Sequence, residues 1–142
     1  MGRDLWAKMH GATVHFPIAL VMVSFALDGA GRILPSLAMR RSLHAAAYWS
    51  ILLGAAASVP AVIAGLMLSK GVVLGHGPLR LHHLFAWPAF ALIVAAATWR
   101  ALGRGSANER PPVGYLVTVA AAAALFAATG YWGGEMLMGG PP

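Results

Sequence analysis

Four long apolar blocks, separated by short polar connections, dominate the pattern of hydrophobic and polar positions along the chain. They lie at about residues 14–34, 43–69, 79–102 and 113–133, and the second contains no formal charge. Each is close to or above the roughly 20 residues that an α-helix needs to cross about 30 Å of hydrocarbon. Because a backbone in lipid must satisfy its own hydrogen bonds, the pattern predicts transmembrane helices rather than open strands.

The connections between the blocks are short and contain residues that break helices. They read GRILPSLAMRR, KGVVLGHGPLR and GRGSANERPP. Short connections make consecutive helices antiparallel. The expected fold is therefore all-α, an integral membrane four-helix bundle with up-down-up-down topology, formed as a single domain over residues 1–142.

The composition supports this fold and excludes several kinds of site. The 142 residues are 59% hydrophobic and 10% charged, whereas a soluble domain is about 25% charged. The net charge is +6, but the basic residues are scattered, so we expect no nucleic-acid partner. The chain has no cysteine, which excludes disulfides, thiolate metal sites and the covalent attachment of c-type haem.

The lysines and arginines near the connections predict how the helices are oriented in the membrane. Six arginines accompany the first and third connections, and four basic residues accompany the termini and the second connection. By the positive-inside rule, this places both termini and the second connection outside, in the periplasm if the chain lies in a bacterial inner membrane. The first set is Arg32, Arg40, Arg41, Arg100, Arg104 and Arg110, and the second is Arg3, Lys8, Lys70 and Arg80.

The histidines are the residues that suggest a function. Five of the six lie on one side of the expected membrane, near the starts of the first and third helices. A polar side chain at membrane depth is costly, and neutral imidazole is the commonest metal ligand. The five are His10, His15, His76, His82 and His83, while His44 lies on the opposite side.

This arrangement favours a b-type haem held between one histidine of the first helix and one of the third. We expect His15 and His83 as the axial ligands of the haem iron, with His10 and His82 in reserve. Since His82 and His83 are about 100° apart around a helix, only one of them faces the centre, and the spacing does not decide which. Arg80 and Glu135 lie on the same side and are expected near the haem propionates. One haem is expected, and a second stays open.

Bis-imidazole ligation leaves the iron no open position, which suits electron transfer. The predicted function is an electron-transfer subunit without catalytic activity of its own. It would pass electrons between an extracytoplasmic redox protein or dehydrogenase subunit and the quinone pool or another cytochrome. We find no paired-carboxylate, nucleophile–base or phosphate-loop motif in the sequence.

Three alternatives remain from the residues alone. The first is a bare copper, iron or zinc ion bound by His10, His15 and His82 or His83, which requires three or more imidazoles that converge. The second is a membrane anchor without a cofactor. The third is a quinone-binding subunit that uses histidine and tryptophan at the interface. A haem, in contrast, requires an apolar slot between the helices.

Asp28 is the one acidic residue inside the first block. Arg32 follows it one helical turn later, so the spacing favours an ion pair between the two side chains near the inner surface. A proton-relay carboxylate is the alternative.

Two motifs resemble a known bacterial family. The segment His10-Gly-Ala-Thr-Val-His15-Phe16-Pro17-Ile18-Ala19-Leu20 and the closing Gly130-Tyr131-Trp132-Gly133-Gly134-Glu135 are similar to motifs of a family of small four-helix membrane proteins, catalogued as domain of unknown function 2231. The resemblance covers nearly the whole chain and implies the same four-helix fold. It departs at Gly11, where the family often has proline, and after Glu135, where a histidine of the family is absent.

Overall fold

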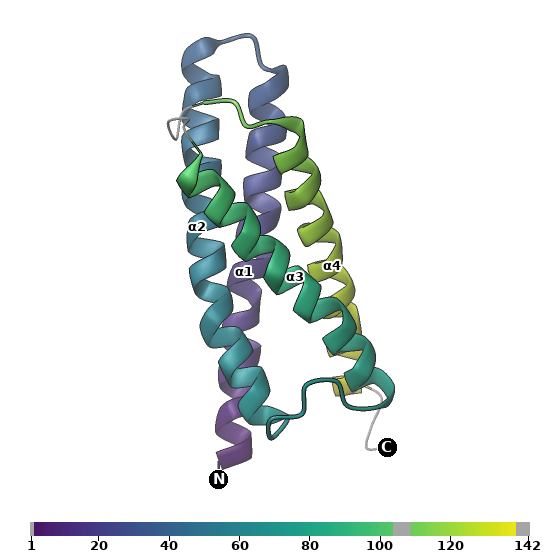
Figure 1. Ribbon diagram of the computed structural model, residues 1–142. Coiled ribbons are helices and arrows are strands. Elements are labelled where there is room, and N and C mark those ends of the chain that lie inside the picture. The colour runs from purple at the N-terminus through teal and green to yellow at the C-terminus, as the bar shows by residue number, and fades with distance from the viewer. Residues whose placement is uncertain (1, 104–108, 139–142) are drawn as a thin grey trace.

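A computed structural model describes residues 2–103 and 109–138 of the protein. The described chain forms an up-and-down bundle of four long helices (Figure 1), which confirms the predicted fold class. Arg104, which contributed to the orientation argument, lies outside the described residues. The helices are α1 (Gly2–Ile33), α2 (Leu37–Leu68), α3 (Gly77–Leu102) and α4 (Val113–Met138).

All four helices are long and apolar enough to cross a membrane. Three bounds differ by several residues from the predicted blocks: α1 begins at Gly2 instead of near residue 14, α2 begins at Leu37 instead of near residue 43, and α4 ends at Met138 instead of near residue 133. A helix of 32 residues is about 48 Å long, which exceeds the roughly 30 Å of hydrocarbon. The α1 helix therefore extends beyond the apolar layer, and Asp4 in its first turn interacts favourably with the helix dipole.

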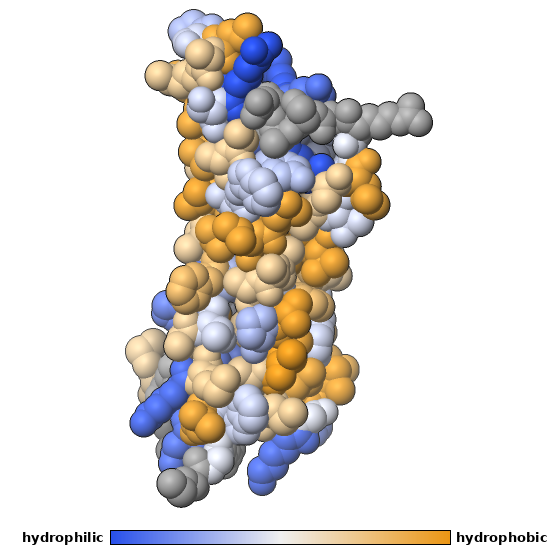
Figure 2. All heavy atoms as spheres, turned by 90° about the vertical axis from the view of Figure 1, so that its left-hand side faces the viewer, coloured by the Kyte–Doolittle hydropathy of each residue, from blue (hydrophilic) through white to orange (hydrophobic). Residues whose placement is uncertain are grey.

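The outward-facing side chains fit a lipid environment. Phe16, Trp49 and Leu53 are more than half exposed, at 62%, 59% and 57%. Figure 2 shows apolar side chains over the middle of the visible face, with the strongly hydrophilic residues gathered mainly toward its two ends. Such an extended apolar belt would be a liability in water and is the expected surface in a bilayer.

The bundle consists of two helical hairpins. The most extensive packing joins α1 to α2 and α3 to α4, and the contacts between the hairpins are fewer. The α1–α2 connection is short, and the Ser36 side chain caps α2 by accepting a hydrogen bond from the backbone N–H of Met39. Hydrogen bonding at this N-cap is the usual way to satisfy a free helix-terminal N–H.

The two hairpins place their buried residues at equivalent positions. Asp28 of α1 and Arg100 of α3 are both buried and 72 residues apart. The same spacing relates most of the other buried residues of α1 to buried residues of α3, and a second constant spacing relates most of those of α2 to buried residues of α4; His83 and Ala97 of α3 have exposed equivalents. Since α1 and α3 run in the same direction, the hairpins are related by a pseudo-two-fold axis along the bundle, a relation known for membrane proteins built from repeats. The equivalent pairs include Val21 and Ile93, Ser24 and Ala96, Ile51 and Val119, and Gly54 and Ala122.

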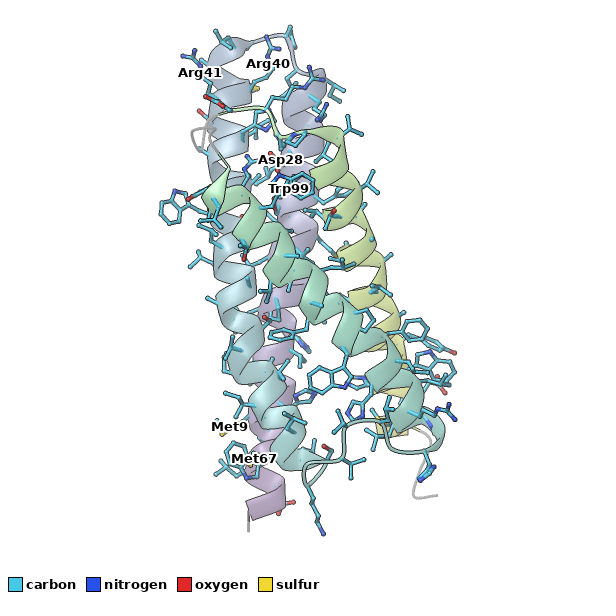
Figure 3. All side chains as sticks on the ribbon, in the orientation of Figure 1. Met9, Asp28, Arg40, Arg41, Met67 and Trp99 are labelled. Atoms are coloured by element: carbon cyan, nitrogen blue, oxygen red, sulfur yellow. The ribbon has the colours of Figure 1, made fainter. Side chains whose placement is uncertain are left out.

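The two ends of the bundle differ in chemistry. The first residues of α1, the last of α4 and the α2–α3 loop lie at one end (Figure 1), which we call the histidine end because it contains His10, His15, His76, His82 and His83. The opposite end, the arginine end, contains Arg32, Arg40, Arg41 and Arg110. Figure 3 shows Arg40 and Arg41 at this end.

Candidate functional site

A cavity of about 330 Å³ lies between the helices at the histidine end. All four helices contribute to its walls, which are almost entirely apolar. The volume is at the lower end of the range for ligand-binding sites. Four histidines are the main polar side chains of the lining: His10 and His15 from α1, and His82 and His83 from α3.

The His10 ring is held in place by α2. Its Nδ1 atom lies 2.9 Å from the carbonyl oxygen of Ala61. Because a carbonyl only accepts, Nδ1 must carry the proton and donate it, which leaves Nε2 of the neutral ring with a free lone pair. One turn further along α2, a Cβ atom at Gly65 would lie 2.9 Å from His10 Cε1, so the ring occupies the space that glycine leaves.

The His82 ring is held by α4 in the same way. Its Nδ1 atom donates to the carbonyl oxygen of Thr129 at 3.0 Å. Gly133 lies one turn further along α4, and a Cβ atom there would be 3.5 Å from His82 Nδ1. Thr129 and Gly133 are the equivalents of Ala61 and Gly65, so the repeat has placed two identical imidazole donors on either side of the pseudo-two-fold axis.

The two held imidazoles lie close together in the wall of the cavity. The ring centres of His10 and His82 are 6.3 Å apart, with 72° between the ring planes. Two Nε2 lone pairs are both acceptors and cannot hydrogen-bond to each other. A transition metal bound by two imidazoles at about 2 Å each would bring the ring centres to roughly 6 Å. The arrangement therefore fits one metal centre with two imidazole ligands.

Of the other predicted site residues, His15 and His83 also line the cavity, whereas Arg80 and Glu135 do not. His15 lines the cavity but is exposed at its edge, while His83 is 8% exposed and its Nδ1 atom has no hydrogen-bond partner among the described residues. Arg80 is exposed, Glu135 is half-buried, and neither is among the residues that line the cavity. The structure thus gathers all four predicted histidines around one cavity. The His82 ring centre lies 6.3 Å from that of His10 and 5.7 Å from that of His83, and the choice of ligand pair stays a prediction.

A bare metal ion would need a larger set of ligands. Within residues 2–103 and 109–138, no group of three or more histidine, aspartate or glutamate side chains is arranged to hold a metal ion. The cavity instead combines an apolar lining with imidazoles from α1 and α3, residues that could hold a metal-containing group from two sides.

A second group of buried polar residues lies at the arginine end. The buried Asp28 carboxylate accepts a hydrogen bond from His44 Nδ1 at 2.7 Å, and both of its oxygens are within 3.3–3.4 Å of the Arg100 guanidinium. Arg100 also donates to the His44 carbonyl at 3.1 Å and lies 5.1 Å from the centre of the Tyr115 ring. Each helix contributes one buried residue to this Asp28 cluster, and Figure 3 shows Asp28 between the helices.

The Asp28 cluster corrects two predictions. The expected Asp28–Arg32 pair is wrong, because Arg32 instead donates to the carbonyl of Pro111. Arg100 is buried at 9% exposure and is not a loop charge, so the positive-inside bias is smaller than the sequence count. Reasoning along one helix missed the cluster because its members come from four helices. Asp28 and Arg100 occupy equivalent positions in the repeat, and recognising the repeat in the sequence could have paired them.

A family model described as "Predicted membrane protein (DUF2231)" matches residues 7–139. The chain therefore belongs to this family of predicted membrane proteins. No curated protein and no solved structure matches the chain. The family match and the four apolar helices together make the chain a multi-pass membrane protein.

Proposed function

Starting from a four-span membrane protein of this family, we propose that the chain binds one b-type haem at the histidine end and serves as an electron-transfer subunit. The observation that carries the proposal is the pair His10 and His82, with ring centres 6.3 Å apart in an apolar cavity. Both rings are fixed by Nδ1 bonds to backbone carbonyls. Such a bond at the second nitrogen is the usual way to orient a metal-ligating imidazole.

The geometry favours His10 and His82 as the axial ligands over His15 and His83. In our proposal His10 and His82 hold the iron from opposite sides, and the apolar wall excludes water from it. Two protein ligands leave the iron without an open position, so the bound group would transfer electrons rather than react with oxygen. His15 and His83 would lie at the edge of the bound group.

We propose that the electron partner is a protein on the extracytoplasmic side of the membrane. The basic residues at the arginine end favour a cytoplasmic location for that end, so the histidine end would face the periplasm. The described chain has little structure beyond its four helices, so a separate extracytoplasmic redox protein or dehydrogenase subunit would supply or receive the electrons. The quinone pool or another cytochrome would be the other partner.

An optical spectrum of the detergent-purified protein tests the proposal. The protein is expressed with haem available, and spectra of the oxidised and dithionite-reduced forms are recorded with a pyridine haemochrome assay. We expect a sharp b-type α-band in the wild type, its loss in His10→Ala and His82→Ala, and its retention in His15→Ala and His83→Ala.

Each other outcome has a distinct meaning. Loss of the band in His15→Ala and His83→Ala alone would restore the ligand pair that the sequence favoured. A colourless wild-type protein would refute the haem proposal. Elemental analysis of that protein would then separate a copper, iron or zinc site from a membrane anchor without a cofactor.

A further inference from the structure

The two grooves between the hairpins are unequal, although the repeat makes them equivalent. One groove runs between α1 and α4, and the other between α2 and α3. At each of four lining positions the α2–α3 groove has the bulkier side chain. The pairs, with the α1–α4 residue first, are Gly11 and His83, His15 and Trp87, Gly130 and Val62, and Gly134 and Leu66.

The α2–α3 groove is the more closed of the two. His83 is buried there, and Trp87 is half-buried. The Trp87 indole N–H donates to the carbonyl of Val73 at 2.8 Å, which ties the α2–α3 loop to this side of the cavity. Access to the cavity from this side is therefore obstructed by side chains and by the loop.

The α1–α4 groove leaves the cavity open. Gly11, His15 and Gly130 are exposed, and all three line the cavity. A Cβ atom added at Gly11, Gly130 or Gly134 would meet nothing within 4 Å. The open side of the cavity thus lies between two membrane-spanning helices, with His15 as its polar side chain.

The position of this opening restricts what can use it. Both helices that border it are apolar membrane spans, so a lipid-soluble molecule in the bilayer can reach it from the side. The cavity is small for a large planar macrocycle, so the edge of a bound haem would extend toward the open side. A flat apolar ring could lie against the glycines, and an oxygen on that ring could hydrogen-bond to His15.

We propose that a lipid-soluble hydroquinone binds in the α1–α4 groove, with a hydroxyl group hydrogen-bonded to His15, and reduces the haem through its exposed edge. This inference rests on the proposed function and names its electron donor. Because each chain would hold one haem, one hydroquinone would reduce the ferric haems of two protein molecules, giving one electron to each. Both of its O–H bonds break, two protons pass to water, and the quinone leaves.

Anaerobic mixing of the ferric, haem-loaded protein with decyl-ubiquinol tests the inference. We follow the reduced α-band in the wild type and in His15→Phe, Gly11→Leu and Gly29→Leu. Gly29 lies on the same face of α1 as Gly11, five turns away, and an added Cβ atom there also meets nothing within 4 Å. Gly29→Leu is therefore a control for adding a leucine to α1 outside the cavity.

We expect wild type and Gly29→Leu to be reduced at the same rate, with half a molecule of quinol consumed per haem. Gly11→Leu and His15→Phe should be reduced at least tenfold more slowly, although dithionite still reduces both fully. Wild-type protein that dithionite reduces and quinol does not would overturn the inference while the haem proposal stands. Equal quinol rates in wild type, Gly11→Leu and His15→Phe would overturn it as well.

Photolabelling with an azido-quinone gives a readout that does not depend on haem. We expect labelled peptides from α1 around His15 and from α4 around Gly130, and a loss of labelling in Gly11→Leu. Labelling confined to α2 and α3 would refute the proposed groove, even in a protein that proves to be colourless.

Discussion

At Gly65 and Gly133, the absence of a Cβ atom leaves room for the imidazole rings of His10 and His82. The space is tighter at Gly65, where an added Cβ would lie 2.9 Å from His10 Cε1, than at Gly133, where it would lie 3.5 Å from His82 Nδ1. Contacts near 3.5 Å are ordinary packing, whereas 2.9 Å forces the ring or the helix to move. The orientation of His10 is therefore more sensitive to its glycine than that of His82.

Gly65→Ala should weaken haem binding more than Gly133→Ala does. The alanine methyl would displace the His10 ring and lengthen its bond to Ala61, so we expect about a tenfold loss of affinity, or about 1.4 kcal/mol. Haem titration of the apoprotein, followed by absorbance, measures both variants. Equal affinities for wild type and Gly65→Ala would argue against His10 as a ligand.

The choice among the histidines could be made only in part from the sequence. The sequence places imidazoles at one end of two parallel helices, and four of the five line one cavity. It does not separate His82 from His83, because that choice depends on a hydrogen bond to Thr129 on another helix. The sequence also does not show that α2 holds the His10 ring, through the Ala61 carbonyl and the space at Gly65, so the preference for His15 over His10 stays a prediction that the ligand variants test.

At the level of helices, the apolar blocks predict the existence and the order of the helices well, but they place the starts of α1 and α2 too late and the end of α4 too early. The start of α1 was placed too late because hydrophobicity marks where a helix meets lipid, and nothing requires the helix to end there. The repeat of the hairpins was also missed. It is visible in short matches, such as Ala19-Leu20-Val21 with Ala91-Leu92-Ile93, once the 72-residue spacing of Asp28 and Arg100 is known.

The Asp28 cluster joins the two hairpins at the arginine end, and the charges of Asp28 and Arg100 compensate each other. Removing one of the two charges should therefore destabilise the protein more than removing both. Asp28→Asn keeps an oxygen that can accept from His44 Nδ1 but leaves the Arg100 charge buried and uncompensated. Breaking a buried pair in this way costs about 3–5 kcal/mol. Adding Arg100→Met removes the unpaired charge, so we expect the double variant to recover most of the lost stability.

Unfolding of the purified protein in mixed detergent micelles, titrated with denaturing detergent, measures these variants. Arg41→Gln serves as the control, since Arg41 is exposed at the same end of the bundle. A single Asp28→Asn variant as stable as the control would show that the cluster does not hold the hairpins together. A double variant less stable than the single one would show that Arg100 contributes through contacts other than Asp28, such as the Tyr115 ring.

For the whole molecule, the two ends have separate roles. His10 and Asp28 are 18 residues apart on α1, which corresponds to about 27 Å along the helix. The proposed haem at the histidine end would therefore lie near one membrane surface, whereas the arginine end contains the buried Asp28 cluster. The proposed electron donor in the lipid and the proposed acceptor on the extracytoplasmic side would both bind at the half of the bundle that contains the histidine end.

The orientation of the whole molecule decides whether that acceptor can reach the haem. Because the chain has no cysteine, single cysteines at exposed positions report the orientation without background. Val72→Cys marks the α2–α3 loop, and Met39→Cys marks the arginine end; both native side chains are exposed. With the arginines inside, a membrane-impermeant maleimide should label Val72→Cys on intact cells and Met39→Cys only after permeabilisation. Without the buried Arg100, the two ends of the bundle carry similar numbers of loop charges. The positive-inside rule then favours this orientation by a small margin, and the labelling tests it directly.

The reverse labelling would place the histidine end in the cytoplasm. The haem site would then be unaffected, but its partner would have to be a cytoplasmic redox protein.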